Sequence, residues 1–586
     1  MPNSQTALAQ GAFWQWRRDR AGPQPPRISQ MTWRRLPSAW VALLIYSLVA
    51  VALFSSTWVD PAARWIGSPK DPGLFIWYLG WIPHQLSLGH NPLFTDHLSY
   101  PLGVNLMWNT SMIFPALLFW PVTALFGPVV AYNVLITASL ALSAWFGFLA
   151  ARRFVDRPAA CFVAGLVYGF SPALVAQALG HPHVTVSLFP PIALILGHEI
   201  LVRRHMHPAA AGALAGVATA LQLLTGEELL AATLVIAAAG VALLALVHRD
   251  EVRAALPYAA KAAGAALGVF ALLAAYPLGF QFLGPQRVFG NVQQPDIYVS
   301  DLLAFVVPSN FIHFTGNPTE NGAYVGLPLL VLFGAGLVIG WRKASIRWIG
   351  LMALVVAVLS LGPHLHVNGN VTQVVLPWAA VASLPLMGSA LPARLMAIGF
   401  LGIGIVVAES CARAMVAARP WRTATAVVLL AGLVAIVPSL PYPSVPAAAP
   451  AFFTTGGDVG RIAPGSVVLV TPFSSHQSAD AMYWQAVADY RFRMPEGDAF
   501  TPGPYLGPHP SFLESTFDAL DAGLTVTVTP DVRNLALADL KALGVTAIVA
   551  GPSPGEGAIV GFLTEIEGEA PVDDGGVKVW WQLPPP

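Results

Sequence analysis

Residues 58–109 read WVDPAARWIGSPKDPGLFIWYLGWIPHQLSLGHNPLFTDHLSYPLGVNLMWN and follow the first long apolar run of the chain. The stretch interleaves tryptophan and tyrosine with titratable side chains, namely Asp60, Lys70, Asp71, His84, His90, Asp96 and His97. Tryptophan and tyrosine are enriched at the headgroup depth of a bilayer. The pattern therefore predicts a surface loop whose aromatics sit at the lipid and whose acids face water and substrate. An interfacial helix with solvated charges is the alternative.

The composition around this loop indicates a membrane protein. Of 586 residues, 55% are hydrophobic and 10% are charged, whereas a soluble domain carries about 25% charged residues. The 30 basic and 30 acidic residues balance, which argues against a nucleic-acid partner. Cys161 and Cys411 both lie in apolar runs, so no disulfide framework is expected.

Before and after this loop, about eleven apolar runs are long enough to cross the ~30 Å hydrocarbon core of a bilayer. They are 38–58, 131–151, 159–178, 185–202, 208–225, 229–247, 257–279, 323–340, 346–361, 395–417 and 423–440. Residues 112–126 are apolar but short and contain Pro115 and Pro121, which favours a membrane-embedded hairpin or half-helix. The fold class predicted is a polytopic α-helical membrane protein.

The distribution of arginine and lysine orients these spans. Basic clusters recur at alternate connections, including those after residues 151, 202 and 340, if 112–126 does not cross. Basic residues mark cytoplasmic loops. This predicts an Arg/Pro-rich cytoplasmic segment 1–36, a transmembrane domain 37–440 in the plasma (inner) membrane, and a loop 59–130 on the outer face.

The last part of the chain, 441–586, has a different character. Residues 441–450 read as an extended linker. Short apolar runs at Ser466–Thr471, Val545–Ala550 and Val577–Leu583 predict strands, and Leu535–Leu543 predicts a helix before the second of them. We expect a small extracytoplasmic α/β domain with a structural or substrate-guiding role.

Ionisable residues at the outer ends of the spans are candidates for a site. A charge near membrane depth costs about 2.5–3.5 kcal/mol on insertion scales, so it suggests function. The candidates are His181, His183, Glu227, Glu228, Glu320, Tyr324, His366 and Arg394. A solvated loop residue or helix cap is the alternative for each, including Glu227, Glu228 and His366. His181 and His183 have no third metal ligand at a fixed spacing, and the chain has no P-loop, dinucleotide fingerprint or H-E-x-x-H motif.

Several short motifs in these loops carry a resemblance. They are Lys70-Asp71-Pro72-Gly73 with Trp77, Asn91-Pro92-Leu93-Phe94 through Asp96, Tyr100-Pro101-Leu102-Gly103, and more weakly Gly180-His181, residues 320–324 and Pro392-Ala393-Arg394. With the predicted topology, the chain resembles the GT-C superfamily of integral membrane glycosyltransferases. Many members carry two adjacent acids at the first site, whereas here Pro72 follows Asp71, so Asp71 acts alone or with Asp96 or Asp60.

The resemblance implies transfer of a sugar from a polyprenyl-phosphate carrier to a glycan, lipid or protein acceptor on the outer face. Asp71 would be the general base that such a transfer needs. Arg394, Arg287 or Lys70 would hold the donor phosphate, and Asp96 and His97 would support a divalent cation such as Mg²⁺ or Mn²⁺ or orient the acceptor. The acceptor or cavity would be lined by His97, Tyr100, His181, His183, Glu227, Glu320 and Tyr324.

Two other classes of protein fit the same composition. A transporter or flippase of lipid-linked saccharides would also need a polar cavity among helices. Transporters are often built from two repeats, and no two-fold repeat of spans is visible here. A non-catalytic scaffold in envelope assembly is the other alternative.

Overall fold

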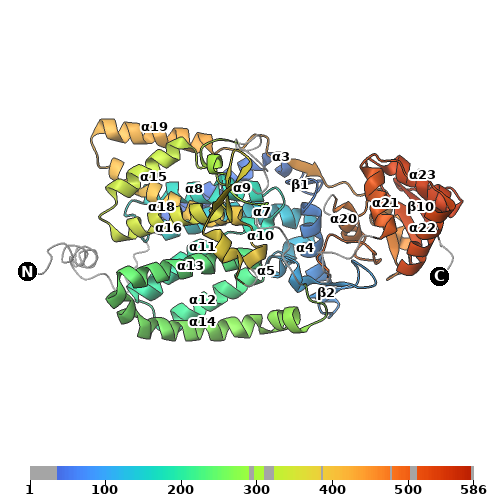
Figure 1. Cartoon of the computed structure of the whole chain (residues 1–586), viewed down its shortest axis with the longest axis horizontal. Helices are drawn as coiled ribbons and strands as arrows, with labels where there is room; N and C mark the ends of the chain where they lie inside the picture. The colour runs from blue at the N-terminus through green and yellow to red at the C-terminus, as the bar shows by residue number, and fades with distance from the viewer. Residues whose placement is uncertain are drawn as a thin grey trace, which may run out of the picture. The chain divides into compact units, whose positions relative to one another are not determined.

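The computed structural model describes residues 36–288, 296–308, 322–384, 387–474, 478–501 and 511–581, which are mostly helical (Figure 1). The chain divides into two compact units. One unit comprises Met1–Ser55, Ile136–Leu273 and Asn291–Tyr442, and the other comprises Ser56–Leu135, Ala274–Gly290 and Pro443–Pro586. Each unit is therefore assembled from segments that are distant in sequence.

The first unit is a bundle of apolar helices. Its helices are α2 (Leu36–Leu53), α8 (Pro158–Gly169), α9 (Pro172–Gln177), α10 (Pro182–Thr185), α11 (Phe189–His198), α12 (Pro208–Leu223), α13 (Glu227–Val247), α15 (Leu327–Ile339), α16 (Ala344–Ser360), α17 (Trp378–Ala382), α18 (Met396–Ala414) and α19 (Arg419–Ala435). Helices α7 (Pro128–Ala151) and α14 (Arg249–Leu283) contribute residues to both units.

Within the described residues, six helical stretches are long and apolar enough to cross a membrane. They are Pro128–Ala151, Pro158–Gln177, Pro182–Arg203, Glu227–Val247, Arg249–Leu283 and Pro392–Ala414. Four shorter apolar helices, Ala39–Leu53, Pro208–Leu223, Leu327–Ile339 and Ala344–Ser360, match further runs predicted from the sequence. The chain is an integral membrane protein, and the number of eleven crossings stays a prediction.

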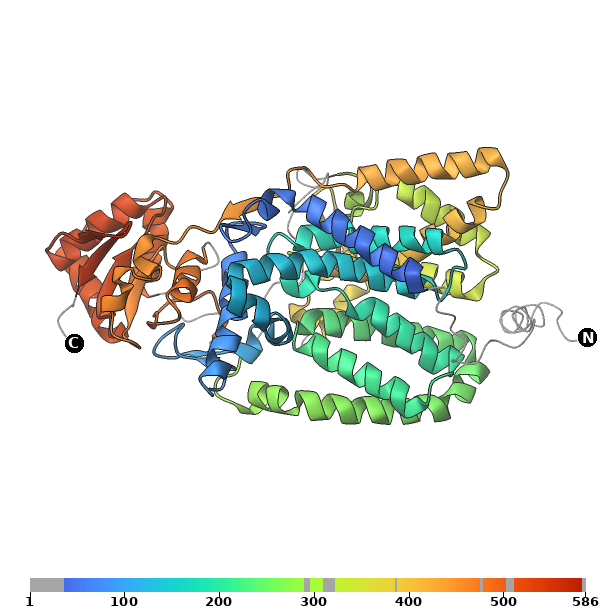
Figure 2. The same ribbon diagram turned by 180° about the vertical axis from the view of Figure 1, so that it is seen from behind.

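Small residues allow the helices of the first unit to pack closely. A Cβ atom on Gly212 or Gly216 of α12 would overlap the carbonyl oxygens of Ala262 and Ala266 in α14, and Figure 2 shows these two helices side by side. A Cβ on Gly404 of α18 would lie 2.8 Å from a carbonyl oxygen of α8. Helices that cannot gain from expelling water rely on such close contacts.

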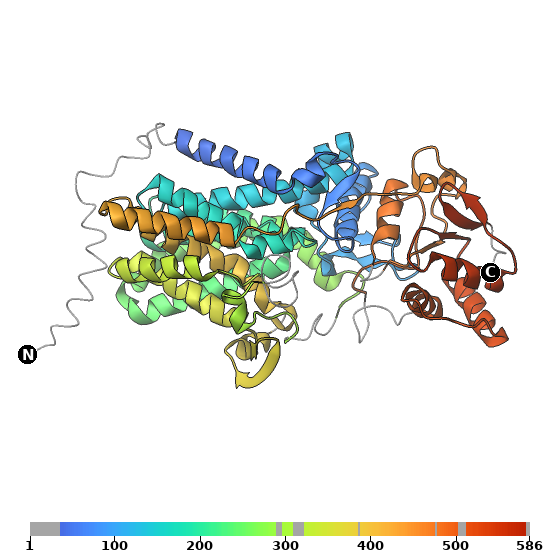
Figure 3. The ribbon, with the colours of Figure 1, turned by 90° about the horizontal axis from the view of Figure 1, so that it is seen from above.

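A hairpin of β4 (His364–Val367) and β5 (Asn370–Val375) extends from the helices of the first unit (Figure 3). Acids hold it at both ends: at its open end His364 Nδ1 lies 2.8 Å from Asp296 Oδ2, and at its turn Gly369 N donates to Asp301 Oδ2 at 2.7 Å. The sequence did not predict this hairpin, because its apolar residues on β5 face solvent rather than a core.

The first loop belongs to the second unit. Strand β1 (Arg64–Ile66) pairs antiparallel with β6 (Ser444–Pro446), and β2 (Phe94–Thr95) pairs with β3 (Val104–Asn105). The main helix of the loop is α4 (Pro72–Ser87). Residues 112–126 form α5 (Ile113–Leu118) and α6 (Trp120–Phe126), which have 6 and 7 residues and are too short to cross a bilayer, as expected.

The end of the chain forms a sheet of four strands in the order β7-β8-β10-β9. Strands β7 (Val468–Thr471) and β8 (Ala547–Ala550) are parallel, and β10 (Val577–Trp581) is antiparallel to β8 and to β9 (Val572–Asp574). The accompanying helices are α20 (Asp480–Val487), α21 (Phe512–Asp521), α22 (Pro530–Leu543) and α23 (Glu556–Glu567). The predicted strands and helix are confirmed, while a separate extracytoplasmic domain stays a prediction.

Candidate functional site

Asp71 immediately precedes α4 at its N-cap position. Its backbone carbonyl accepts from Leu74 N at 3.1 Å and Phe75 N at 3.4 Å, and Pro72 at the first helical position has no N–H to satisfy. The Asp71 side chain is half-buried and makes no cap hydrogen bond. The positive end of a helix dipole favours a carboxylate at this place. The local sequence therefore presents an acid at a helix start without using it as a cap.

Helix α4 is held by the segment around α20. A Cβ atom on Gly73 would lie 3.0 Å from Ala479, and one on Gly80 would overlap the hydroxyl of Tyr490. That hydroxyl donates to Trp77 O at 2.9 Å. The two glycines allow these approaches, so Asp71 begins a helix whose position depends on the C-terminal part of the chain.

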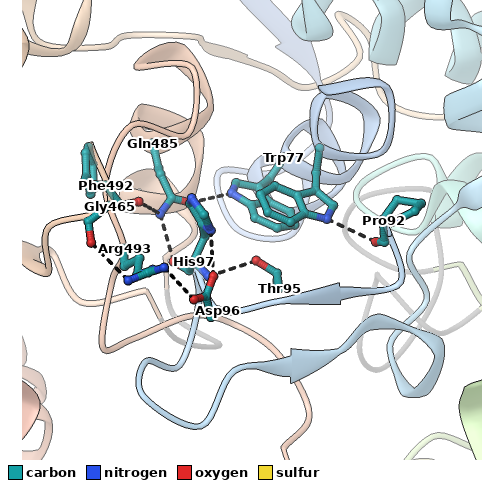
Figure 4. A network of polar contacts seen from close by, with 10 residues as sticks. Trp77, Pro92, Thr95, Asp96, His97, Gly465, Gln485, Phe492 and Arg493 are labelled. Carbon is teal, nitrogen blue, oxygen red and sulfur yellow. Dashed lines mark hydrogen bonds and ion pairs between the residues drawn. The ribbon is translucent and has the colours of Figure 1, made fainter. Parts of the chain in front are cut away.

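Gln485 is the centre of the hydrogen bonds that join these segments (Figure 4). Its Oε1 accepts from Trp77 Nε1 at 2.7 Å, and its Nε2 donates to the carbonyls of His97 and Phe492, both at 2.9 Å. The side chain is fully buried. A buried amide with both ends paired fixes three chain segments at once.

The structure brings Asp96 and His97 together beside Arg493 (Figure 4), and Tyr100 also contacts Arg493. Asp96 Oδ2 lies 2.9 Å from Arg493 Nη2, and Asp96 Oδ1 lies 3.1 Å from His97 Nδ1. The Arg493 guanidinium also stacks over the Tyr100 ring, 5.4 Å from its centroid. Burial lowers the pKa of His97, although Asp96 opposes the shift. These predicted site residues thus fasten the first loop to the C-terminal segment.

The prediction that the loop aromatics face the lipid is wrong for the four residues Trp65, Trp77, Tyr78 and Trp81. Their exposed fractions are 2%, 0%, 1% and 1%. Each indole N–H finds an acceptor within the unit: Ser68 O, Gln485 Oε1 and Pro92 O. Because the C-terminal segment supplies aromatic contacts and the acceptor for Trp77, and the loop itself supplies the other two acceptors, these rings pack inside the protein. Burial and the nearby Asp498 carboxylate raise the pKa of Tyr78.

In the first unit, Arg394 forms a second polar cluster. It lies in the 3₁₀ turn Pro392–Leu395, pairs with Glu228, and places Nη1 3.3 Å from His183 Nε2. Glu228 also accepts from Leu391 N at 2.9 Å. The cluster borders a small hollow whose lining includes Val184, Leu229 and Leu395. The sequence had not paired Glu228 with Arg394.

The other predicted residues are more dispersed. Lys70, Glu227 and Arg287 are exposed. The rings of His181 and His183 lie 5.9 Å apart. Tyr324 is 7% exposed, and burial raises the pKa of its hydroxyl. Glu320 lies outside the described residues. Within the part of the chain that is described, no group of three or more His, Cys, Asp or Glu side chains could hold a metal ion.

Sequence reasoning missed Gln485, Arg493 and Tyr132. Gln485 and Arg493 lie about four hundred residues from their partners, and no motif marks them. Tyr132 lies in an apolar run and is indistinguishable from a core aromatic there.

Solved structures of similar fold are GT-C glycosyltransferases. The arabinofuranosyltransferase AftD from Mycobacteria has a TM-score of 0.56 at 16% identity, over 92% of this chain and 40% of that chain. A mutant of the same enzyme has a TM-score of 0.50 at 17% identity, over 87% of this chain and 36% of that chain. This chain thus spans about two fifths of the length of AftD, and at this identity the likeness shows the fold alone. The fold resemblance expected from the sequence is confirmed.

The sequence comparisons are less informative about activity. No curated protein matches this chain. The profile of the family described as "Domain of unknown function (DUF6311)" matches residues 43–437. Since that is well over half of the 586 residues, the chain belongs to this family.

Proposed function

We propose that the protein is a membrane glycosyltransferase that moves a sugar from a polyprenyl-phosphate carrier to a glycan, lipid or protein acceptor on the outer face. The GT-C fold supports transfer as the reaction class. The observation that carries the proposal is Asp71, a half-buried acid at a helix start that is not used as a cap. Acids in such places are candidates for acid–base chemistry.

Asp71 would act as the general base of an inverting transfer. Its carboxylate takes the proton of the acceptor hydroxyl while the acceptor oxygen attacks the anomeric carbon and the bond to the lipid phosphate breaks. General-base catalysis of this kind contributes about 10²–10⁴ in rate. The N-terminus of α4 stabilises the carboxylate in its ionised, proton-accepting form.

Arg394 is our candidate for the phosphate of the donor. Its guanidinium already pairs with Glu228, so a lipid phosphate would compete with that carboxylate or share the remaining N–H groups. Arginine binds phosphate in a bidentate way that lysine cannot copy. Arg287 and Lys70 are the alternatives, and both are exposed.

The direct test is a screen of purified protein against radiolabelled polyprenyl-phosphate sugars, with acceptor-dependent release of lipid phosphate as the signal. In the active combination, Asp71→Asn should reduce turnover by about 10²–10⁴ while the donor still binds. The change is nearly isosteric and removes the proton-accepting charge.

Asp96→Asn is the matched control in the same loop. Asp96 is paired with Arg493, and a partly exposed ion pair contributes about 0–1 kcal/mol to stability. Its loss should leave turnover within a few-fold of the wild type. Near-normal turnover in Asp71→Asn with an inactive Asp96→Asn would place the base at Asp96. Full activity in both variants would contradict the proposed mechanism.

A further inference from the structure

Tyr132, near the start of α7, has a buried hydroxyl group that makes no hydrogen bond to the described part of the chain. The side chain is fully buried, and its Oη has no hydrogen-bond partner among the described residues. Buried polar groups are nearly always paired. Other buried tyrosines follow this rule: Tyr46 donates to Phe162 O at 2.8 Å and Tyr483 donates to Ala447 O at 3.1 Å.

The neighbour of Tyr132 fixes the chain that leads to Asp71. Asn133 Nδ2 donates to the carbonyls of Pro61 and Arg64 at 2.9 and 2.7 Å, and its Oδ1 accepts from Ile66 N at 3.0 Å. The start of α7 is thereby tied to β1, which ends five residues before Asp71. The Asp71 carboxylate lies within electrostatic range of the Tyr132 hydroxyl. Both belong to the second unit.

We propose that Tyr132 is a positioning residue of the Asp71 site, whose hydroxyl donates a hydrogen bond to the carboxylate through one bridging water. This inference rests on the proposed function, because it assigns Asp71 a task. Tyr132 keeps its own proton: the acceptor proton passes to Asp71, and the acceptor oxygen bonds to the anomeric carbon as the lipid phosphate leaves. A donor to a carboxylate favours its charged form, so Tyr132 would keep the base ionised and orient its carboxylate.

Tyr132→Phe tests this inference without an enzymatic assay. Carbodiimides react with protonated carboxyl groups, so the pH dependence of Asp71 labelling in the purified full chain, measured by peptide mass spectrometry, reports its protonation. Loss of the hydrogen bond should move the midpoint of that curve up by about one pH unit, a tenfold gain in proton affinity. The matched control is Tyr483→Phe, which loses one bonded hydroxyl in the same unit and should leave the midpoint unchanged.

Thermal unfolding separates this role from a structural one. In acid, where Asp71 is protonated in both proteins, Tyr132→Phe should unfold at the wild-type temperature or higher, because its hydroxyl has no hydrogen-bond partner among the described residues, while Tyr483→Phe should unfold at a lower temperature. At neutral pH, Tyr132→Phe should lose the stability that corresponds to its shifted labelling midpoint. An unchanged labelling midpoint, or a marked loss of stability in Tyr132→Phe in acid, would overturn the assignment. The proposed function fails separately, if Asp71→Asn retains turnover, and that result would leave the labelling comparison intact.

Discussion

At the scale of single residues, Glu496 gives the clearest dependence on pH. The side chain is 3% exposed, Oε1 accepts from Val470 N at 3.1 Å, and Oε2 has no hydrogen-bond partner among the described residues. Burial raises the pKa of Glu496 well above its usual 4.5, although the Val470 N–H opposes the shift. The folded protein therefore keeps a proton that the unfolded chain has lost, and stability falls as the pH rises from about 4.5 toward the raised pKa.

Glu496→Gln should remove this dependence, because the amide still offers an acceptor to Val470 and does not titrate. We expect the variant to unfold at a higher temperature than the wild type at neutral pH, with the difference shrinking as the pH approaches 4.5. The slope is at most about 1.4 kcal/mol per pH unit. Thermal unfolding in detergent at several pH values measures it, and parallel curves for the two proteins would contradict the prediction.

Substitutions of Arg394 and of Glu228 should have different effects on the binding of a polyprenyl phosphate. Their side chains are 12% and 21% exposed, so removing one partner leaves the other charge poorly solvated. Arg394→Ala should lower the unfolding temperature and weaken binding of a polyprenyl phosphate, and Arg394→Lys should weaken binding less. Glu228→Gln should bind the lipid phosphate at least as tightly as the wild type, because the guanidinium loses its internal competitor. If Arg394→Ala binds normally, Arg287 becomes the candidate.

At the scale of elements, the sequence predicts what depends on local composition. Long apolar runs gave the helices, and the short runs at 466–471 and 545–550 gave β7 and β8. The surroundings of α4 could not be predicted this way. Its aromatics satisfy an interfacial pattern equally well, and their burial depends on a segment four hundred residues later.

In the candidate site, too, features set by local sequence were predictable, and features set by contacts distant in sequence were not. Asp71 is marked by its neighbours in sequence, since Pro72 and Gly73 signal a helix start after a turn. Asp96 was grouped with Asp71 because both are acids in one loop, but its role is set by Arg493, which no local pattern reveals. The sequence allowed Glu228 to be either a site residue or a solvated charge. In the structure it forms an ion pair with Arg394. The pairing of residues that are distant in sequence could thus not be predicted from the pattern of a single sequence.

At the scale of the whole molecule, the family match and the second unit do not coincide. The match ends at residue 437, before β6, so Gln485 and Arg493 lie beyond it. Yet these two side chains pair with the loop that carries Asp71. The region shared with the family therefore includes the proposed base but not the residues that fix its helix.

The orientation of the chain in the membrane is the prediction on which the outer-face site depends. The one-sided arginine clusters put 59–130 and everything after 440 outside. Ala62 and Ala463 are exposed in these segments, and Ala418 is exposed in a connection predicted to be cytoplasmic. Ala344, in another such connection, is 4% exposed, so a cysteine there would not react with a maleimide from either side of the membrane. The native Cys161 and Cys411 are buried, so they contribute little background.

An impermeant maleimide applied to intact cells should therefore modify Ala62→Cys and Ala463→Cys but not Ala418→Cys. Permeabilising the cells should expose the third position, which shows that its thiol is reactive and that the membrane had protected it. The predicted orientation rests on charges in the connections close to the spans. Because the chain changes side at each crossing, one miscounted crossing would invert every later loop. Labelling of both Ala418→Cys and Ala62→Cys in intact cells would put the two residues on the same side. The number of crossings between residues 62 and 418 would then be even, and one span would have been miscounted. Labelling of Ala418→Cys alone would invert the whole chain and place Asp71 on the cytoplasmic side, where an outer-face acceptor cannot reach it.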